Sequence, residues 1–182
     1  MTVVFVGVIS SLIASVVYAL LSFGIKPKIK ISDKICVTTN DDGSFTYKIK
    51  IVNRSLFQLV NVSYHLDYGF SGRDDISYVT EISPNKSPMS TITKKNSKNT
   101  DYAIRVTYTI DGDKYVCKDN SYFDFTIQAT HPLSNSIVCK KKRYYNDDLA
   151  HDCTFQIGEN TDILDLRSYT NMSRQPVKAQ QK

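Results

Sequence analysis

Cysteines and histidines are the residues of this chain whose side chains could perform nucleophilic or metal chemistry. The tightest pairing of the two types is His151 with Cys153, near Asp147, Asp148 and Asp152. A thiol nucleophile and an imidazole base must converge on one reacting atom, which two residues on one short segment rarely do. Two ligands also do not complete a tetrahedral metal site, and Cys-x-x-Cys is absent. We therefore expect no cofactor and no metal, and an enzyme using Cys153 and His151 is the third of three hypotheses.

The four cysteines have a second interpretation that depends on the compartment of the domain. They are Cys36, Cys117, Cys139 and Cys153. In an exported domain an even number of cysteines favours disulfides, and four cysteines leave three pairings open. In a reducing cytoplasm the same residues are expected to be buried thiols. The sequence leaves their disulfide state open.

A basic cluster in the C-terminal part of the chain is a candidate for contact with anions. Its members are Lys140, Lys141, Lys142 and Arg143. Each basic side chain near an anionic membrane contributes about 1 kcal/mol of attraction. The alternative, favoured by the acidic Asp147 and Asp148 behind the cluster, is an edge strand whose lysines prevent aggregation. A net charge of only +5 does not favour nucleic acid as the partner.

The elements that position these residues begin with a strongly apolar segment. Residues 1–25 contain no charged side chain, and Val3 to Phe23 is an almost unbroken apolar run. At about 1.5 Å per residue, a helix of this length spans about 30 Å, the thickness of the hydrocarbon core of a bilayer. A cleaved signal peptide has a shorter apolar run and a basic start. The sequence therefore predicts one N-terminal transmembrane anchor helix over residues 1–25.

Lysines that follow this segment predict its orientation. They are Lys26, Lys28, Lys30 and Lys34, and no lysine or arginine precedes the apolar run. Positive residues close to a helix end are retained in the cytoplasm. We expect a short outer N-terminus, these lysines at the membrane surface, and a cytoplasmic C-terminal domain of a single-pass cell-membrane protein. The alternative is an exported domain.

Small residues recur along one face of the predicted helix. Gly7, Ser11, Ser15 and Ala19 are spaced by four residues. In lipid, a stripe of small residues lets two helix backbones approach closely and associate. The stripe is therefore a candidate surface for self-association or for a partner helix. The alternative is the general richness of transmembrane helices in small residues.

Alternation of apolar and polar residues dominates the rest of the chain. A period of two predicts half-buried strands, and turn residues separate the runs. The strongest runs cover residues 45–51, 60–68, 102–110 and 123–129. Weaker strands are expected at 28–37, 76–82, around Ile92, and at 114–118, 137–145 and 154–157. We expect an all-β fold, an antiparallel Ig-like β-sandwich, with a small β-barrel as the alternative.

The predicted elements divide the chain into four parts. An anchor covers residues 1–25, and a basic junction at 26–34 leads into the first strand. The β-sandwich domain covers 35–166, and a flexible polar tail covers 167–182.

Three stretches of the sequence also carry a resemblance. They read ISSLIASVVYALLSFGIKPKIKIS, YKIKIVNRSLFQLVNVSYHL and FTIQATHPLSNSIVCKKKRYYNDD. Together they resemble a group of uncharacterised bacterial membrane proteins with one N-terminal transmembrane helix, a Lys-Pro-Lys-Ile junction and an Ig-like β-sandwich. The resemblance covers most of residues 8–158 and implies an architecture, without an activity.

These observations favour a binding function over catalysis. We expect a non-catalytic, membrane-tethered interaction module that binds a cytoplasmic protein or associates with its own copies. Its partners would be the lipid bilayer and a protein, reached through the helix or the domain, since tethering raises effective concentration. The alternative is an exported ligand- or envelope-binding domain with disulfides. The sequence does not identify the partner or the oligomeric state.

Overall fold

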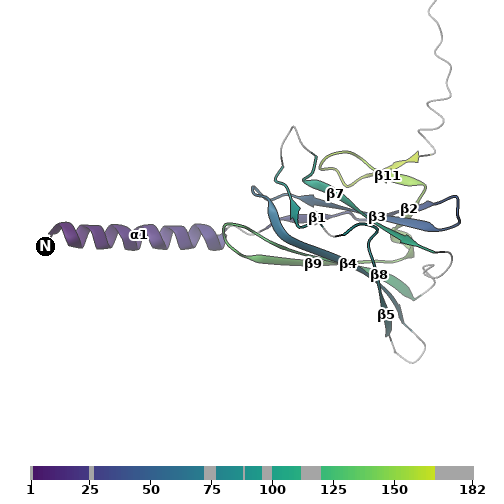
Figure 1. Ribbon diagram of the computed structural model, residues 1–182, viewed down its shortest axis with the longest axis horizontal. Helices are drawn as coiled ribbons and strands as arrows, with labels where there is room; N and C mark the ends of the chain where they lie inside the picture. The colour runs from purple at the N-terminus through teal and green to yellow at the C-terminus, as the bar shows by residue number, and fades with distance from the viewer. Residues whose placement is uncertain are drawn as a thin grey trace, which may run out of the picture.

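The structure is a computed structural model in which one helix extends from a β-rich domain (Figure 1). It describes residues 2–24, 27–71, 77–87, 89–95, 100–111 and 120–166. The helix α1 spans Thr2–Gly24. The strands are β1 Ile29–Ile31, β2 Ile35–Thr39, β3 Phe45–Asn53, β4 Leu59–Ser71, β5 Ser77–Ile82, β6 Thr91–Ile92, β7 Ala103–Ile110, β8 Ser121–Thr130, β9 Ile137–Tyr144, β10 Leu149–His151, β11 Cys153–Phe155 and β12 Ile163–Asp165. A short 3-10 helix, η2, spans Asn146–Asp148.

The strand predictions hold wherever the structure describes the chain. The four strongly alternating runs form β3, β4, β7 and β8, and the predicted strand at 28–37 is divided into β1 and β2. The runs at 76–82, around Ile92, at 137–145 and at 154–157 correspond to β5, β6, β9 and β11. The strand expected at 114–118 and the tail at 167–182 lie outside the described residues. The sequence did not predict β10 and β12.

The first sheet is built around β3. One edge of β3 pairs with β7, and the other edge pairs with β1 and then β2, all antiparallel. Ser32 bridges the break between β1 and β2, because its backbone N–H donates to the Lys50 carbonyl at 2.8 Å and its Oγ accepts from the Lys50 N–H at 3.2 Å. β10 pairs with β2 in parallel. Residues 29–31 of the basic junction therefore belong to the sheet.

The second sheet is built around β4. One edge of β4 pairs with β8, and the other pairs with β6 near its start and with β5 near its end. β9 pairs with β8 and is the outermost strand on that side in the described part of the chain. β11 and β12 form a separate antiparallel pair.

The two main sheets share one hydrophobic core. Ile49 and Ile51 of β3 are fully buried, as are Phe125 and Ile127 of β8, and all four belong to the same cluster. The Tyr47 and Phe123 rings, one from each sheet, have centroids 5.2 Å apart. Burial of each large apolar side chain contributes about 1.5–3 kcal/mol. At this coarse level the domain is a β-sandwich.

Candidate functional site

Helix α1 presents its apolar side chains to its surroundings. All side chains from Val4 to Leu20 are exposed except that of Ala19, which is partly buried. Val4 and Leu20 are 72% and 69% exposed. Large exposed apolar surfaces mark sites of interaction with proteins or membranes, or liabilities for aggregation. Within the described residues, no helix combines the length and the apolar character needed to cross a membrane.

The predicted small-residue stripe lies on this helix. A Cβ atom built on Gly7 would meet no atom within 4 Å other than those of its chain neighbours and the backbone of its own helix. The Ser15 hydroxyl donates to the Ser11 carbonyl at 2.9 Å, which satisfies it inside its own helix. The stripe is therefore an open helix face whose central hydroxyl needs no outside partner.

Two loops of the domain lie beside the chain that leads away from the helix (Figure 1). The Lys28 N–H donates to the Ser55 Oγ at 2.8 Å, and the Arg54 N–H donates to the Lys28 carbonyl at 2.7 Å. These bonds hold the β3–β4 loop against the junction. The Phe57 ring of this loop meets the His131 ring edge-on, with centroids 5.2 Å apart. The β8–β9 loop is thereby brought to the same end of the domain.

Buried Asn53 shapes the first of these loops. Its side-chain amide donates to the Phe57 and Thr93 carbonyls, both at 2.9 Å. Its side-chain oxygen accepts from the Ser55 N–H at 2.8 Å. Since Asn53 is fully buried, this network fixes the loop on the end of β3.

We call Lys28, Arg54–Phe57 and His131–Ile137 the helix-proximal end. It exposes large apolar side chains, with Leu56 81%, Leu133 53% and Ile137 63% exposed. The Lys28 side chain on the junction and the Arg54 side chain on the β3–β4 loop are exposed at the same end. Apolar side chains beside basic ones are typical of protein surfaces that lie on anionic lipid headgroups.

The junction lysines are separated by the folding of the first strands. Lys28 is exposed at the helix-proximal end, Lys30 is partly buried in β1, and Lys34 is exposed where β2 begins. Lys26 lies outside the described residues. Of the four lysines predicted to lie at the membrane surface, only Lys28 is described as part of the helix-proximal end.

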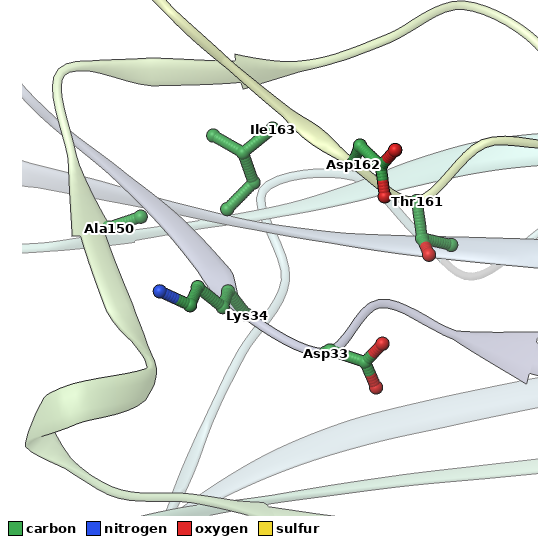
Figure 2. Close-up of a pocket in the computed structure, with 6 residues that line it drawn as sticks. All are labelled: Asp33, Lys34, Ala150, Thr161, Asp162 and Ile163. Carbon is green, nitrogen blue, oxygen red and sulfur yellow. The ribbon is translucent and has the colours of Figure 1, made fainter.

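Lys34 lines a pocket of about 350 Å³ between β2, β10 and the start of β12. Its lining residues are Asp33, Lys34, Ala150, Thr161, Asp162 and Ile163. Figure 2 shows the Lys34 side chain extending toward the strand of Ala150 and away from Asp33. The lining offers carboxylates and an ammonium group, without a nucleophile held by a base. Among the described residues, no three His, Cys, Asp or Glu side chains are grouped to hold a metal ion.

The basic cluster on β9 is bound to neighbouring elements. The Arg143 Nε and Nη2 each donate to a different oxygen of Asp124 at 2.8 Å, and the Lys141 Nζ lies 2.8 Å from the same carboxylate. The Lys142 Nζ pairs with Asp33. The remaining member, Lys140, donates from its Nζ to the Ile29 carbonyl at 2.6 Å. Every cation of the cluster therefore has an intramolecular partner.

The electrostatics of this cluster are dominated by Asp124, whose side chain is 5% exposed. Burial alone raises the pKa of the Asp124 carboxyl, but hydrogen bonds from Arg143 and Lys141 outweigh it and hold the pKa below its ordinary value. The same hydrogen bond raises the pKa of the Arg143 guanidinium. Since β9 is an outer strand with these cations along it, the arrangement favours edge protection over a free anion-binding surface.

A stack of side chains on the outer face of this sheet was missed by the sequence reasoning. The Arg143 guanidinium carbon lies 3.8 Å from the centre of the Tyr122 ring. That ring covers Gly69, where an added Cβ would lie 2.3 Å from a ring carbon. A cation–π contact contributes about 0.5–1 kcal/mol at exposed sites. The glycine that directly follows the alternating run at 60–68 was the only sequence signal of this close approach.

Two cations on the face of the first sheet opposite the core were also missed. Lys50 and Arg105 are ladder partners on β3 and β7. The Lys50 Nζ donates to the carbonyls of Gln156 and Asn160, and the Arg105 Nη2 donates to the Phe155 carbonyl at 2.9 Å. Burial, followed by repulsion from Arg105, lowers the pKa of the Lys50 ammonium group.

Lys50 and Arg105 also line a pocket of about 370 Å³ together with the segment they hold. Because their hydrogen bonds go to backbone carbonyls, these cations fasten residues 155–160 to the sheet. Lys50 is 1% exposed as a consequence.

The environments of Cys153 and His151 do not favour the enzyme hypothesis. Cys153 is 2% exposed and its Sγ donates to the Ala150 carbonyl at 3.1 Å, whereas His151 is exposed on β10. Burial raises the pKa of the Cys153 thiol. A raised pKa disfavours the thiolate, which is the nucleophilic form. Cys36 is buried, Cys139 is exposed, and Cys117 lies outside the described residues.

Comparison with known proteins adds no relative to this picture. No protein-family model matches the chain. No curated protein matches its sequence.

Proposed function

We propose that this chain is a non-catalytic interaction module tethered to a membrane by α1. The observation that carries the proposal is an uncharged helix of 23 residues, with its described apolar side chains exposed. The helix is followed by a domain end that combines exposed leucines with basic residues. In this arrangement α1 crosses the bilayer once, and the helix-proximal end lies on the headgroups.

The lysines after the helix support a cytoplasmic position for the domain. Lys26, Lys28, Lys30 and Lys34 follow α1 closely, and positive residues in such positions stay on the cytoplasmic side. In a reducing compartment the cysteines of the domain, Cys36, Cys139 and Cys153 among them, would stay free thiols. The exported, disulfide-bonded domain is the alternative.

Within this proposal the domain is an Ig-like β-sandwich. Two antiparallel sheets that share one core, with β9 on the outside of its sheet, support a sandwich over a closed barrel. The parallel pairing of β10 with β2 is an addition to a purely antiparallel plan. The resemblance to bacterial single-pass membrane proteins is part of this proposal.

The module would act by holding a partner at the membrane surface. That partner is a cytoplasmic protein or a second copy of the chain, the latter through the open stripe from Gly7 to Ala19. Confinement of the domain to one surface raises the effective concentration of a bound partner without any further contact.

The contact of the domain with lipid can be tested because the chain has no tryptophan. Full-length protein is reconstituted in vesicles that contain anionic lipid. The tryptophan of Leu133→Trp is expected to emit at a shorter wavelength than a tryptophan in water, and brominated lipids should quench its fluorescence. The same holds for Leu56→Trp. The matched control is Val79→Trp on β5, an equally exposed site (59%) far from the helix in Figure 1, which should not be quenched. Equal quenching at Leu133 and Val79, or none at either leucine, would refute the proposed contact.

A further inference from the structure

Cys36 and Cys153 lie side by side although they are far apart in the sequence. Ala150 of β10 is the ladder partner of Cys36 on β2. The Cys153 Sγ donates to the carbonyl of the same Ala150 at 3.1 Å. The two thiols lie close enough for each to affect the pKa of the other. They pack with Phe155 in a small apolar cluster that is separate from the main core.

A bend of the backbone before β11 brings Cys153 against β2. Asp152 adopts a left-handed backbone conformation with a φ of 53°. Apart from glycine, asparagine and aspartate are the residues that adopt this conformation most readily. Its N–H donates to the Val37 carbonyl at 2.9 Å, so the chain stays against β2 as it turns from β10 into β11. The bend therefore turns the Cys153 side chain toward Cys36 instead of toward solvent.

The surroundings of the two thiols fit a covalent link better than a reactive site. Their cluster is lined by Phe155, Ala150 and Ile163, all apolar. Cys36 is fully buried and Cys153 is nearly so. Burial is the main cause that raises the pKa of both thiols, and this disfavours a role as nucleophile or metal ligand in the folded chain.

We propose that Cys36 and Cys153 form an intramolecular disulfide when a disulfide oxidant, such as oxidised glutathione or a dithiol oxidase, meets the folding chain. One thiolate attacks the oxidant's disulfide, which releases a thiol and leaves a mixed disulfide. The second cysteine thiolate then attacks the cysteine sulfur of that intermediate and expels the oxidant's other thiolate. Two S–H bonds are lost and one S–S bond forms. The two electrons and two protons pass to the oxidant, which is reduced to two thiols.

The bond would fasten the segment that Lys50 and Arg105 already hold. It would join β2 to β11 covalently and close a long loop, which stabilises the folded state by restricting the unfolded chain. Of the disulfides that the sequence leaves open, the proposal concerns Cys36–Cys153 alone. Exposed Cys139 stays a free thiol on β9 in the described part of the chain. The inference does not depend on whether α1 is the anchor, but a stable Cys36–Cys153 bond in cells would favour the exported alternative over the cytoplasmic domain.

Redox refolding of the full-length protein in detergent tests this proposal. The chain is refolded in mixtures of reduced and oxidised glutathione, alkylated, digested without reduction, and mapped by mass spectrometry. We expect one cross-linked peptide that joins Cys36 to Cys153, and a higher melting temperature than for the reduced chain. Cys139→Ser should keep both the cross-link and the higher melting temperature, and Cys36→Ser should lose both.

The wild-type peptide map decides the result even if Cys36→Ser does not fold. A dominant cross-link that includes Cys139 or Cys117, or the absence of a Cys36–Cys153 cross-link in the most oxidising mixture, would overturn the proposal. If the Cys36–Cys153 cross-link forms but leaves the melting temperature unchanged, the bond does not stabilise the attachment of β11 to β2.

Discussion

Two lysines placed in helix α1, as Leu12→Lys together with Val16→Lys, are expected to release the protein from membranes. A lysine at the centre of a membrane-spanning helix costs about 2.5–3.5 kcal/mol on insertion scales. Two of them therefore cost about 5–7 kcal/mol, more than a thousandfold in the partition between membrane and water. Leu12 and Val16 are 67% and 53% exposed, so the changes remove little packing from the protein itself.

The measurement is the fraction of full-length protein that stays with membranes after an alkaline carbonate wash. The matched control is Leu12→Ala together with Val16→Ala, which shortens the same side chains without adding charge and should stay in the membrane fraction. If the double-lysine variant remains in the carbonate-washed membranes as completely as the wild type, α1 is not the anchor.

The second large effect is expected from Asp124→Asn, which should lower the unfolding free energy by about 2 kcal/mol at neutral pH. The substitution removes a nearly buried carboxylate that accepts hydrogen bonds from Arg143 and Lys141. The value lies below that of a fully buried pair because Arg143 and Lys141 are 43% and 57% exposed, so solvent screens them in part.

The same variant should weaken the acid sensitivity of the fold. The pKa of the Asp124 carboxyl is lower in the folded protein than in the unfolded chain, where it is about 3.9. Its contribution to stability is therefore complete above the unfolded value, and it is lost as the pH falls through the folded value. Wild-type stability should fall more steeply below about pH 4 than that of Asp124→Asn.

Urea denaturation at neutral and acid pH measures both effects, and Asp33→Asn is the control. Asp33 pairs with Lys142, which lies on β9 like the partners of Asp124. The Asp33 side chain, however, is 78% exposed. Hydrogen bonding to Lys142 lowers the pKa of its carboxyl as well. The control should cost less than about 1 kcal/mol, as surface pairs do. Equal losses for the two variants would show that burial of Asp124 adds nothing.

The sequence predicted most clearly the strands that are long enough for apolar and polar residues to alternate along them. In β7, Ile104, Val106, Tyr108 and Ile110 alternate with polar residues, and the structure buries these four. Strands β10 and β12 have three residues each, too few for a period to appear. They exist through pairing with β2 and β11, which only the folded chain brings near.

The candidate sites show the same division. Lys140 to Arg143 were visible as a basic run, but their partners Asp124, Asp33 and the Ile29 carbonyl lie on other elements. Lys50 has the phase of a solvent-facing residue in an alternating strand, and it is buried because residues 155–160 lie over it. Contacts of this kind depend on which distant segments pack against a strand, and the local pattern of one strand does not specify them.

The most direct test of the central claim uses the exposed thiol of Cys139 on β9. In a Cys117→Ser background, the full-length protein is treated with a membrane-impermeant maleimide, first in intact cells and then after the inner membrane is permeabilised. Cys36 and Cys153 are buried and should react slowly, and Cys139→Ser shows which signal belongs to Cys139. A membrane-tethered domain on the cytoplasmic side predicts Cys139 labelling of membrane-bound protein only after permeabilisation. Labelling of Cys139 in intact cells would contradict it.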